Sequence, residues 1–250
     1  MIVRRIAPAL VPLLLGCQAL DAAEPSRPLG PRIGSVVKAK LPASPSAPKL
    51  LDFVAEPYRD AVAAVLKSPT LTAKASEAEY DVYPAVYDWL LEHPDRTSLA
   101  WQRLEIPCVD ITDLGKGQFY WTDEFASELS WQTVGTFENG RIWFATGKVK
   151  AGGLIPTIPV KAVVILQSPR TAPDATGMSR IKPQVNIVIQ SDSAIATALL
   201  KLAGSQVPKV AEDGAEQLLL YFSGIARTIH KNPDRLAELL GPRATKKPGR

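Results

Sequence analysis

The chain has 250 residues, of which 46% are hydrophobic and 22% are charged, so it has the composition of a globular protein that can bury a core. Lysine and arginine total 29 against 25 aspartate and glutamate residues, and several of the basic residues lie at the two ends of the chain. The remaining body is close to neutral, which argues against a nucleic-acid partner because such proteins need a concentrated basic surface.

The first residues have the pattern of a secretion signal. Two arginines precede an apolar run, residues 6–15, which is too short to cross a bilayer. The run ends in Leu14-Leu15-Gly16-Cys17, which resembles the lipobox of a bacterial lipoprotein signal peptide. The resemblance implies a signal peptide over residues 1–17 and an N-terminal lipid on Cys17.

A lipid on Cys17 would anchor the protein to a membrane of the bacterial cell envelope, facing the periplasm or the exterior. Cleavage farther along, after Ala19 or Ala22, would instead release a soluble periplasmic protein. The sequence contains 2 cysteines, so both routes leave Cys108 without an internal disulfide partner. We expect Cys108 to be a buried structural cysteine.

Residues 18–49 are rich in proline, serine and alanine and lack the apolar density needed to fold. We expect a proline-stiffened tether that holds a domain clear of the lipid headgroups. The alternative is an N-terminal arm that packs on the domain through a short strand at Val36 and Val37. The domain is expected over residues 50–242, followed by a solvated basic tail over residues 243–250.

The first part of the domain has mostly helical patterns. Apolar spacing predicts a helix over residues 56–67, which Ser68-Pro69 ends. An alternating stretch predicts a strand over residues 70–82. Pro84 suits the first turn of the next helix, and Asp95 is placed to cap a further helix over residues 97–104.

From Cys108 onward the spacing of apolar residues changes from helical to alternating. The alternation predicts strands over residues 108–112, 118–122, 128–137, 141–150, 158–167 and 181–190. A short helix over residues 194–203 and a long amphipathic helix over residues 207–229 follow. Pro233 starts a last helical turn that runs to Leu240.

Asn139-Gly140 is the strongest hairpin signal in the chain. A two-residue turn at this pair places Glu138 opposite Arg141, and strict alternation then assigns the flanking side chains to two faces. The face expected to meet the long helix holds Leu129, Trp131, Phe137, Ile142 and Phe144. Trp143 falls on the other face, where we expect it to lie outside, under a loop or in a second cluster.

The order of elements over residues 70–230 resembles the helix-grip, START-like (SRPBCC) superfamily. The resemblance implies an α+β fold in which a curved antiparallel sheet of about six or seven strands wraps around the long C-terminal helix. This agrees with the single apolar stripe of that helix, which needs an apolar surface of similar length. A closed up-and-down barrel with peripheral helices is the alternative.

Helix-grip proteins often enclose a cavity between the sheet and the helix that holds sterols, lipids or other apolar ligands. The resemblance therefore implies an apolar small molecule or lipid as the ligand, with no cofactor. The expected wall consists of aromatic residues: Phe119, Trp121, Trp131, Phe137, Phe144, Tyr221 and Phe222. The alternative is that these aromatic side chains simply fill the core.

The sequence shows no metal-ligand spacing and no catalytic constellation, so binding is favoured over catalysis. An enzyme of the same fold, cyclase-like or hydrolytic, is an alternative that would need a polar residue deep in the cavity. His93, Asp110 and Tyr221 are the candidates for that role. A third alternative is an interaction or structural lipoprotein with a filled core, which works through its outer face near Trp143.

Overall fold

The computed structural model describes residues 47–123, 126–150, 157–194 and 206–242. Several predictions fall outside these residues: the signal peptide with Cys17, the tether as far as residue 46, the helix over residues 194–203 from its second residue on, and the basic tail.

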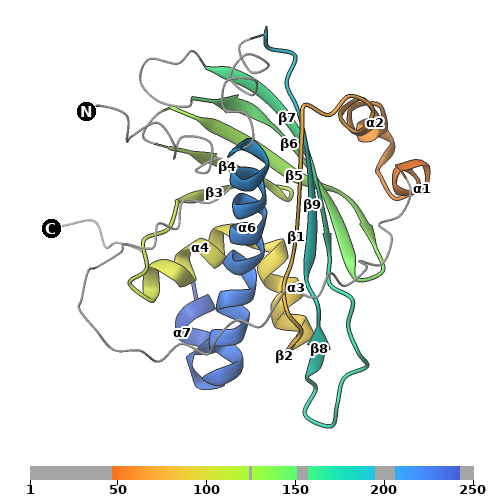
Figure 1. Cartoon of the computed structure of the whole chain (residues 1–250). Helices are drawn as coiled ribbons and strands as arrows, with labels where there is room; N and C mark the ends of the chain where they lie inside the picture. The colour runs from red at the N-terminus through yellow and green to blue at the C-terminus, as the bar shows by residue number, and fades with distance from the viewer. Residues whose placement is uncertain (1–46, 124–125, 151–156, 195–205, 243–250) are drawn as a thin grey trace, which may run out of the picture.

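The described chain consists of short helices, an antiparallel sheet and one long helix near its end (Figure 1). The helices are α1 (Ala47–Leu51), α2 (Arg59–Lys67, after the 3-10 turn Glu56–Tyr58), α3 (Pro84–Glu92), α4 (Pro94–Arg103), α6 (Gln206–Lys231) and α7 (Leu236–Leu240, after the 3-10 turn Pro233–Arg235). The strands are β1 (Leu71–Ser76), β2 (Tyr80–Val82), β3 (Ile111–Gly115), β4 (Gln118–Thr122), β5 (Glu128–Phe137), β6 (Gly140–Val149), β7 (Ile158–Gln167), β8 (Ser179–Ile181) and β9 (Gln184–Gln190).

Seven of these strands form one sheet in the order β1-β9-β7-β6-β5-β4-β3, and every neighbouring pair is antiparallel. β2 and β8 pair with each other in a separate two-stranded sheet. α6 crosses one face of the large sheet, while α1 and α2 lie on its other side (Figure 1). The expected α+β helix-grip fold is confirmed.

The larger hydrophobic core lies between α6 and the sheet. α6 buries Leu219, Phe222, Ile225 and Ile229, which recur every three or four residues and so share one side of the helix. They pack against alternate residues of the strands, among them Ala73, Val164, Leu166, Val185 and Ile187. The apolar stripe read from the sequence is therefore the stripe that the sheet covers.

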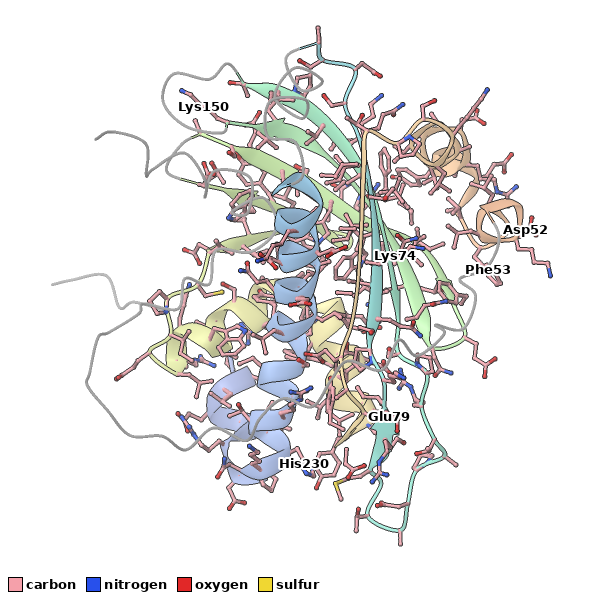
Figure 2. All side chains as sticks on the ribbon, viewed as in Figure 1. Asp52, Phe53, Lys74, Glu79, Lys150 and His230 are labelled. Carbon is pink, nitrogen blue, oxygen red and sulfur yellow. The ribbon has the colours of Figure 1, made fainter. Side chains whose placement is uncertain are left out.

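A second core lies on the opposite face of the sheet. Val62 and Val65 of α2 are fully buried there, in one cluster with Val163 and Ile165 of β7. Phe53 lies just after α1 (Figure 2). Its ring lies 5.5 Å from that of Phe137. Because helices cover both faces of the sheet at β7, residues 163–166 are buried without alternation.

Two strands expected from the sequence are each divided in the structure. The stretch over residues 70–82 forms β1 and β2, which belong to different sheets. The stretch over residues 181–190 is interrupted at Lys182-Pro183, because proline has no N–H for a strand ladder. The strand expected from Cys108 begins only at Ile111, and Cys108 itself is half-buried against the core.

The helix expected over residues 97–104 begins earlier than predicted. It starts at Pro94, so Asp95 lies in its first turn, and no side chain caps its N-terminus. His93 occupies the N-cap position. The earlier start brings Pro94 into the core beneath α6, where it is buried.

The expected register of the β5–β6 hairpin is wrong. Phe137 pairs with Gly140, so the two turn residues are Glu138 and Asn139, and Asn139 adopts a φ of 55°. Asparagine tolerates this left-handed backbone better than most residues do. The turn therefore lies one residue earlier than the Asn139-Gly140 signal predicts.

A bulge in β5 then changes which side chains share a face. The register shifts between Thr133 and Gly135, which adds Val134 to the strand. Trp131 consequently packs with the core under α6, whereas Phe137 packs with the core under α2. The expectation that Trp131 and Phe137 share a face is wrong, because one extra residue reverses the alternation.

Candidate ligand pocket

A pocket lies between α6 and the part of the sheet formed by β3, β4, β5, β6 and β7. Its wall is aromatic and aliphatic: Pro94, Val109, Ile111, Trp121, Leu129, Trp131, Trp143, Ala145, Val164, Leu218, Tyr221 and Phe222. The cavity volume is about 40 Å³, whereas an apolar cavity of about 150 Å³ holds benzene. The side chains leave a gap between the helix and the sheet, but this gap is much smaller than a lipid.

The sheet contributes to the wall through cross-strand neighbours. Trp121 of β4 pairs with Ile111 of β3 on one side and with Leu129 of β5 on the other. Trp131 of β5 pairs with Ala145 of β6. Paired residues point to the same face of a sheet, so the α6 side of these strands presents a continuous apolar surface.

Helix α6 contributes three residues to the wall. Leu218, Tyr221 and Phe222 follow one another at spacings of three and one, and all are buried. The ring of Phe222 lies 5.7 Å from that of Trp143 and meets the ring of Tyr221 edge-on at 4.8 Å. Aromatic pairs prefer such tilted and edge-on arrangements, so the wall is well packed around the gap.

Hydrogen bonds fix α6 against α4 beside the pocket. The Tyr221 hydroxyl donates to the carbonyl oxygen of Pro94 at 2.5 Å. The indole N–H of Trp101 donates to the carbonyl oxygen of Tyr221 at 2.8 Å. Both bonds hold the pocket-lining turn of α6 in place, which limits the ways in which the gap can widen.

The structure brings together four of the seven aromatic residues that the sequence analysis predicted for the cavity wall. Trp121, Trp131, Tyr221 and Phe222 line the pocket. Phe119 lies beside it, buried in the core with its ring 5.7 Å from that of Trp131.

Phe137 and Phe144 lie elsewhere, on the α2 side of the sheet. Both pack against the second core, and the ring of Phe144 lies 6.4 Å from that of Tyr58. Their position follows from the register of β5 and β6, in which Phe144 pairs with Gln132 rather than with Gly135. The expectation that they face the long helix is therefore wrong.

Trp143 is the pocket residue that sequence reasoning placed on the wrong side. It is buried, lines the pocket and donates its indole N–H to the hydroxyl oxygen of Thr133 at 3.1 Å. The expectation that it lies on the outer face is wrong, and the interaction surface proposed near it is not exposed. Trp143 pairs with Thr133, next to the bulge in β5, and strict alternation along the sequence does not reveal this bulge.

The candidate catalytic residues do not converge. His93 stacks on Trp89 with ring centroids 4.2 Å apart, and its Nδ1 lies 2.9 Å from the carbonyl oxygen of Trp89. Asp110 borders a separate surface groove, and its carboxylate accepts from Gln102 at 3.5 Å. Of the three candidates, Tyr221 lines the pocket, and its hydroxyl already donates to Pro94.

The pocket wall carries no charged side chain among the described residues. Within the same residues, no group of three or more histidine, cysteine, aspartate or glutamate side chains is arranged to hold a metal ion. The described helices also include none that is long and apolar enough to span a membrane. The chemistry available in the pocket is therefore apolar and aromatic contact together with a few hydrogen bonds.

No family model matches this chain, and no curated protein matches its sequence. Similar solved structures include a conserved protein from Geobacillus kaustophilus, with 10% identity and a TM-score of 0.37 over 64% of this chain and 96% of that one. Ara h 8.0201 is 16% identical with a TM-score of 0.37, over 65% of this chain and all (100%) of that one. A truncated norcoclaurine synthase from Thalictrum flavum is 14% identical with a TM-score of 0.29, over 61% of this chain and 96% of that one.

Likenesses at these identities and TM-scores concern the arrangement of strands and helices and carry no argument about activity. The fold class of this chain rests on its own elements: seven antiparallel strands and the long helix that they cover. The protein is an α+β helix-grip protein with an apolar pocket between α6 and the sheet.

Proposed function

We propose that this protein binds a compact apolar molecule between α6 and the sheet. The observation that carries the proposal is the pocket itself, where the rings of Trp121, Trp131 and Trp143 meet those of Tyr221 and Phe222 around unfilled space. Ligand sites are typically apolar concavities of this composition.

The small volume sets a condition on binding. A cavity of about 40 Å³ accepts a ligand of several ring atoms only if side chains or α6 move outward. Such movement costs contacts between α6 and the sheet, and burial of the ligand's apolar surface at about 25 cal/mol per Å² offsets that cost. A compact ring compound is therefore favoured over a long acyl chain.

The proposal includes a location on the bacterial envelope. Residues 14–17 support it, because a lipidated Cys17 would anchor the chain and residues 18–49 would space the domain from the bilayer. An apolar ligand and a membrane-anchored carrier are chemically consistent, since apolar molecules partition into the same membrane. Release as a soluble periplasmic protein is the alternative that the later cleavage sites leave open.

Filling the pocket tests the proposal. Ala145→Leu adds three carbons to a buried wall residue, and we expect it to weaken toluene binding at least about tenfold, because the added volume exceeds the room available. Binding is measured by NMR titration of the indole N–H signals, and native mass spectrometry of the protein as purified reports any molecule that it already carries.

The matched control is Phe144→Leu, the adjacent residue of the same strand, whose side chain lies on the α2 face. It should lower the melting temperature and leave toluene affinity within about twofold. The proposal would be refuted if the purified protein carried no co-purified molecule and if toluene did not shift its indole N–H signals. Equal loss of binding in the two variants would place the site elsewhere.

A further inference from the structure

The indole N–H of Trp121 is a buried donor in the pocket wall. Trp121 is 4% exposed and lines the pocket. Within the described residues, no acceptor is placed to bond its Nε1. A buried donor without an acceptor is destabilising relative to one that is bonded, so a ligand acceptor that reaches this N–H would stabilise the folded protein.

The two other fully buried polar side chains of the wall already form hydrogen bonds within the protein. Trp143 donates its N–H to Thr133 at 3.1 Å, and Tyr221 donates its hydroxyl proton to Pro94 at 2.5 Å. Both bonds are made within the protein and orient the side chains that make them. Among the fully buried donors of the wall, the Trp121 N–H is thus the one without an acceptor in the described residues. A ligand that fits this wall should therefore carry an acceptor atom.

A water molecule is a poor partner for this donor. Buried waters make about three hydrogen bonds and need two to four polar partners. The surroundings of Trp121 are aromatic and aliphatic, with Ile111 and Leu129 directly across the neighbouring strands. An organic molecule with an apolar body and one acceptor atom satisfies both the donor and the apolar wall.

An ionised acceptor is also a poor fit. No lysine, arginine or histidine of the described chain lines the pocket. A carboxylate transferred there would lose its hydration and gain no opposite charge, which is strongly disfavoured. A carbonyl oxygen of a ketone or ester accepts a hydrogen bond without carrying a charge.

We propose that the ligand of this pocket is an uncharged, compact carbonyl compound whose oxygen accepts the Trp121 N–H while its apolar body contacts Trp131, Trp143 and Phe222. This inference rests on the proposed function and narrows it, from apolar molecules in general to neutral ketones and esters. Hydrocarbons and free fatty acids are then the weaker ligands, the first for lack of an acceptor and the second for their charge.

Two probes of nearly the same shape test the inference. Cyclohexanone has an acceptor oxygen outside its ring, and methylenecyclohexane has a carbon at the same place. Each is titrated into the purified protein, and the indole N–H signals of its 5 tryptophans are followed by NMR. Trp121→Phe removes the donor and keeps an aromatic ring, and Trp131→Phe makes the same change at another wall residue as the matched control.

We expect cyclohexanone, but not methylenecyclohexane, to move the Trp121 N–H signal downfield. Trp121→Phe should weaken cyclohexanone relative to methylenecyclohexane about five- to tenfold, because the hydrogen bond is lost for one probe alone. Trp131→Phe should leave the ratio of the two affinities within about twofold. The signal shift in the unsubstituted protein decides the question even if Trp121→Phe fails to fold.

The outcomes separate this inference from the proposed function. One outcome is that both probes bind, that Trp121→Phe has the same affinity ratio as the unsubstituted protein, and that the Trp121 signal responds alike to both probes. The carbonyl inference is then wrong, and the proposed binding of apolar molecules stands. If neither probe changes an indole signal of the pocket residues, the proposed function is wrong and the inference falls with it.

Discussion

Glu77 lies just after β1 and is held by two residues of α6. The Ser223 hydroxyl donates to its Oε1 at 2.6 Å, and Arg227 lies 3.3 Å from its Oε2. The guanidinium of Arg227 also stacks on the ring of Tyr80, 4.0 Å from the ring centroid. Burial raises the pKa of the Glu77 carboxyl, and this effect exceeds the opposing effects of Ser223 and Arg227.

The raised pKa predicts a pH-dependent stability. The folded state binds the Glu77 proton more tightly than the unfolded chain does, because the carboxyl has its ordinary pKa of 4.5 in the unfolded chain. The stabilisation is therefore complete below pH 4.5 and is lost as the pH rises through the raised folded pKa. In Glu77→Gln this loss is absent, so the variant should gain stability relative to the unsubstituted protein as the pH rises through that window.

Urea unfolding of both proteins at a series of pH values from 4 to 8 measures the difference in unfolding free energy. Because all other titrating groups are shared, the difference isolates Glu77. Parallel curves for the two proteins across this range would show that the carboxyl titrates normally in the folded state.

Among the elements, α6 and α4 approach closely at Gly224. A Cβ at this position would lie 2.6 Å from two atoms of the Trp101 ring, closer than side chains tolerate. The same Trp101 donates its N–H to the carbonyl oxygen of Tyr221. Glycine at this position thus allows α4 to support the turn of α6 that lines the pocket.

Gly224→Ala should lower the unfolding free energy by about 1–3 kcal/mol, because the rigid indole must move. This loss exceeds the gain of up to ~1 kcal/mol that alanine brings to a helix interior. Gly214→Ala is the matched control in the same helix, since no heavy atom lies within 4 Å of its Cβ position. The control should raise the unfolding free energy by about 0.5–1 kcal/mol.

Thermal and urea unfolding of the two glycine variants provide the comparison. Opposite signs would confirm that contact with Trp101, rather than helix propensity, dominates at residue 224. A stabilised Gly224→Ala protein would contradict the close approach of α4 and α6.

At the scale of the whole molecule, the sheet has different partners on its two faces. The α2 side has a core whose buried residues are aliphatic, with Phe137 and Phe144 packed against it, whereas the α6 side combines a core with the aromatic pocket. β7 serves both, since Val163 and Ile165 face α2 while Val164 and Leu166 face α6. The proposed binding side is therefore the face that the long helix covers.

The proposed envelope location is a property of the whole chain and predicts an effect of Cys17→Ser. The serine cannot form the thioether-linked lipid, so the protein should leave the membrane fraction or remain as an uncleaved precursor. Membrane fractionation, with mass spectrometry of the N-terminal peptide, measures both. Recovery of the unsubstituted protein in the soluble fraction, with an unmodified Cys17 or with Cys17 removed by cleavage, would favour the soluble periplasmic alternative.

The sequence patterns predicted four of the residues that line the pocket, because the signals for these residues are local. Trp121 and Trp131 precede the bulge in β5, so simple alternation assigns them to the α6 face. Tyr221 and Phe222 lie on the apolar stripe of α6, which the helical period reveals. Phe137 and Phe144 were assigned through the hairpin register, where alternation fails.

The failure at the hairpin has a long-range cause. The carbonyl oxygen of Val134, the extra residue of the bulge, accepts from the N–H of Ala55 at 2.8 Å, and Val54 forms a bridge with Gly135. A Cβ on Gly135 would lie 2.4 Å from the carbonyl oxygen of Phe53. The segment between α1 and α2 thus contacts β5 at the bulge, and no short-range pattern reports such a contact.

By itself, the sequence determined the order of elements and the pairing of one long amphipathic helix with an antiparallel sheet, because apolar periodicity is set by neighbours along the chain. The tertiary structure alone decided that Trp143 lines the pocket, that Phe144 lies on the opposite face of the sheet and that the cavity volume is about 40 Å³. These outcomes depend on how distant segments pack against one another, which the spacing of residues does not encode.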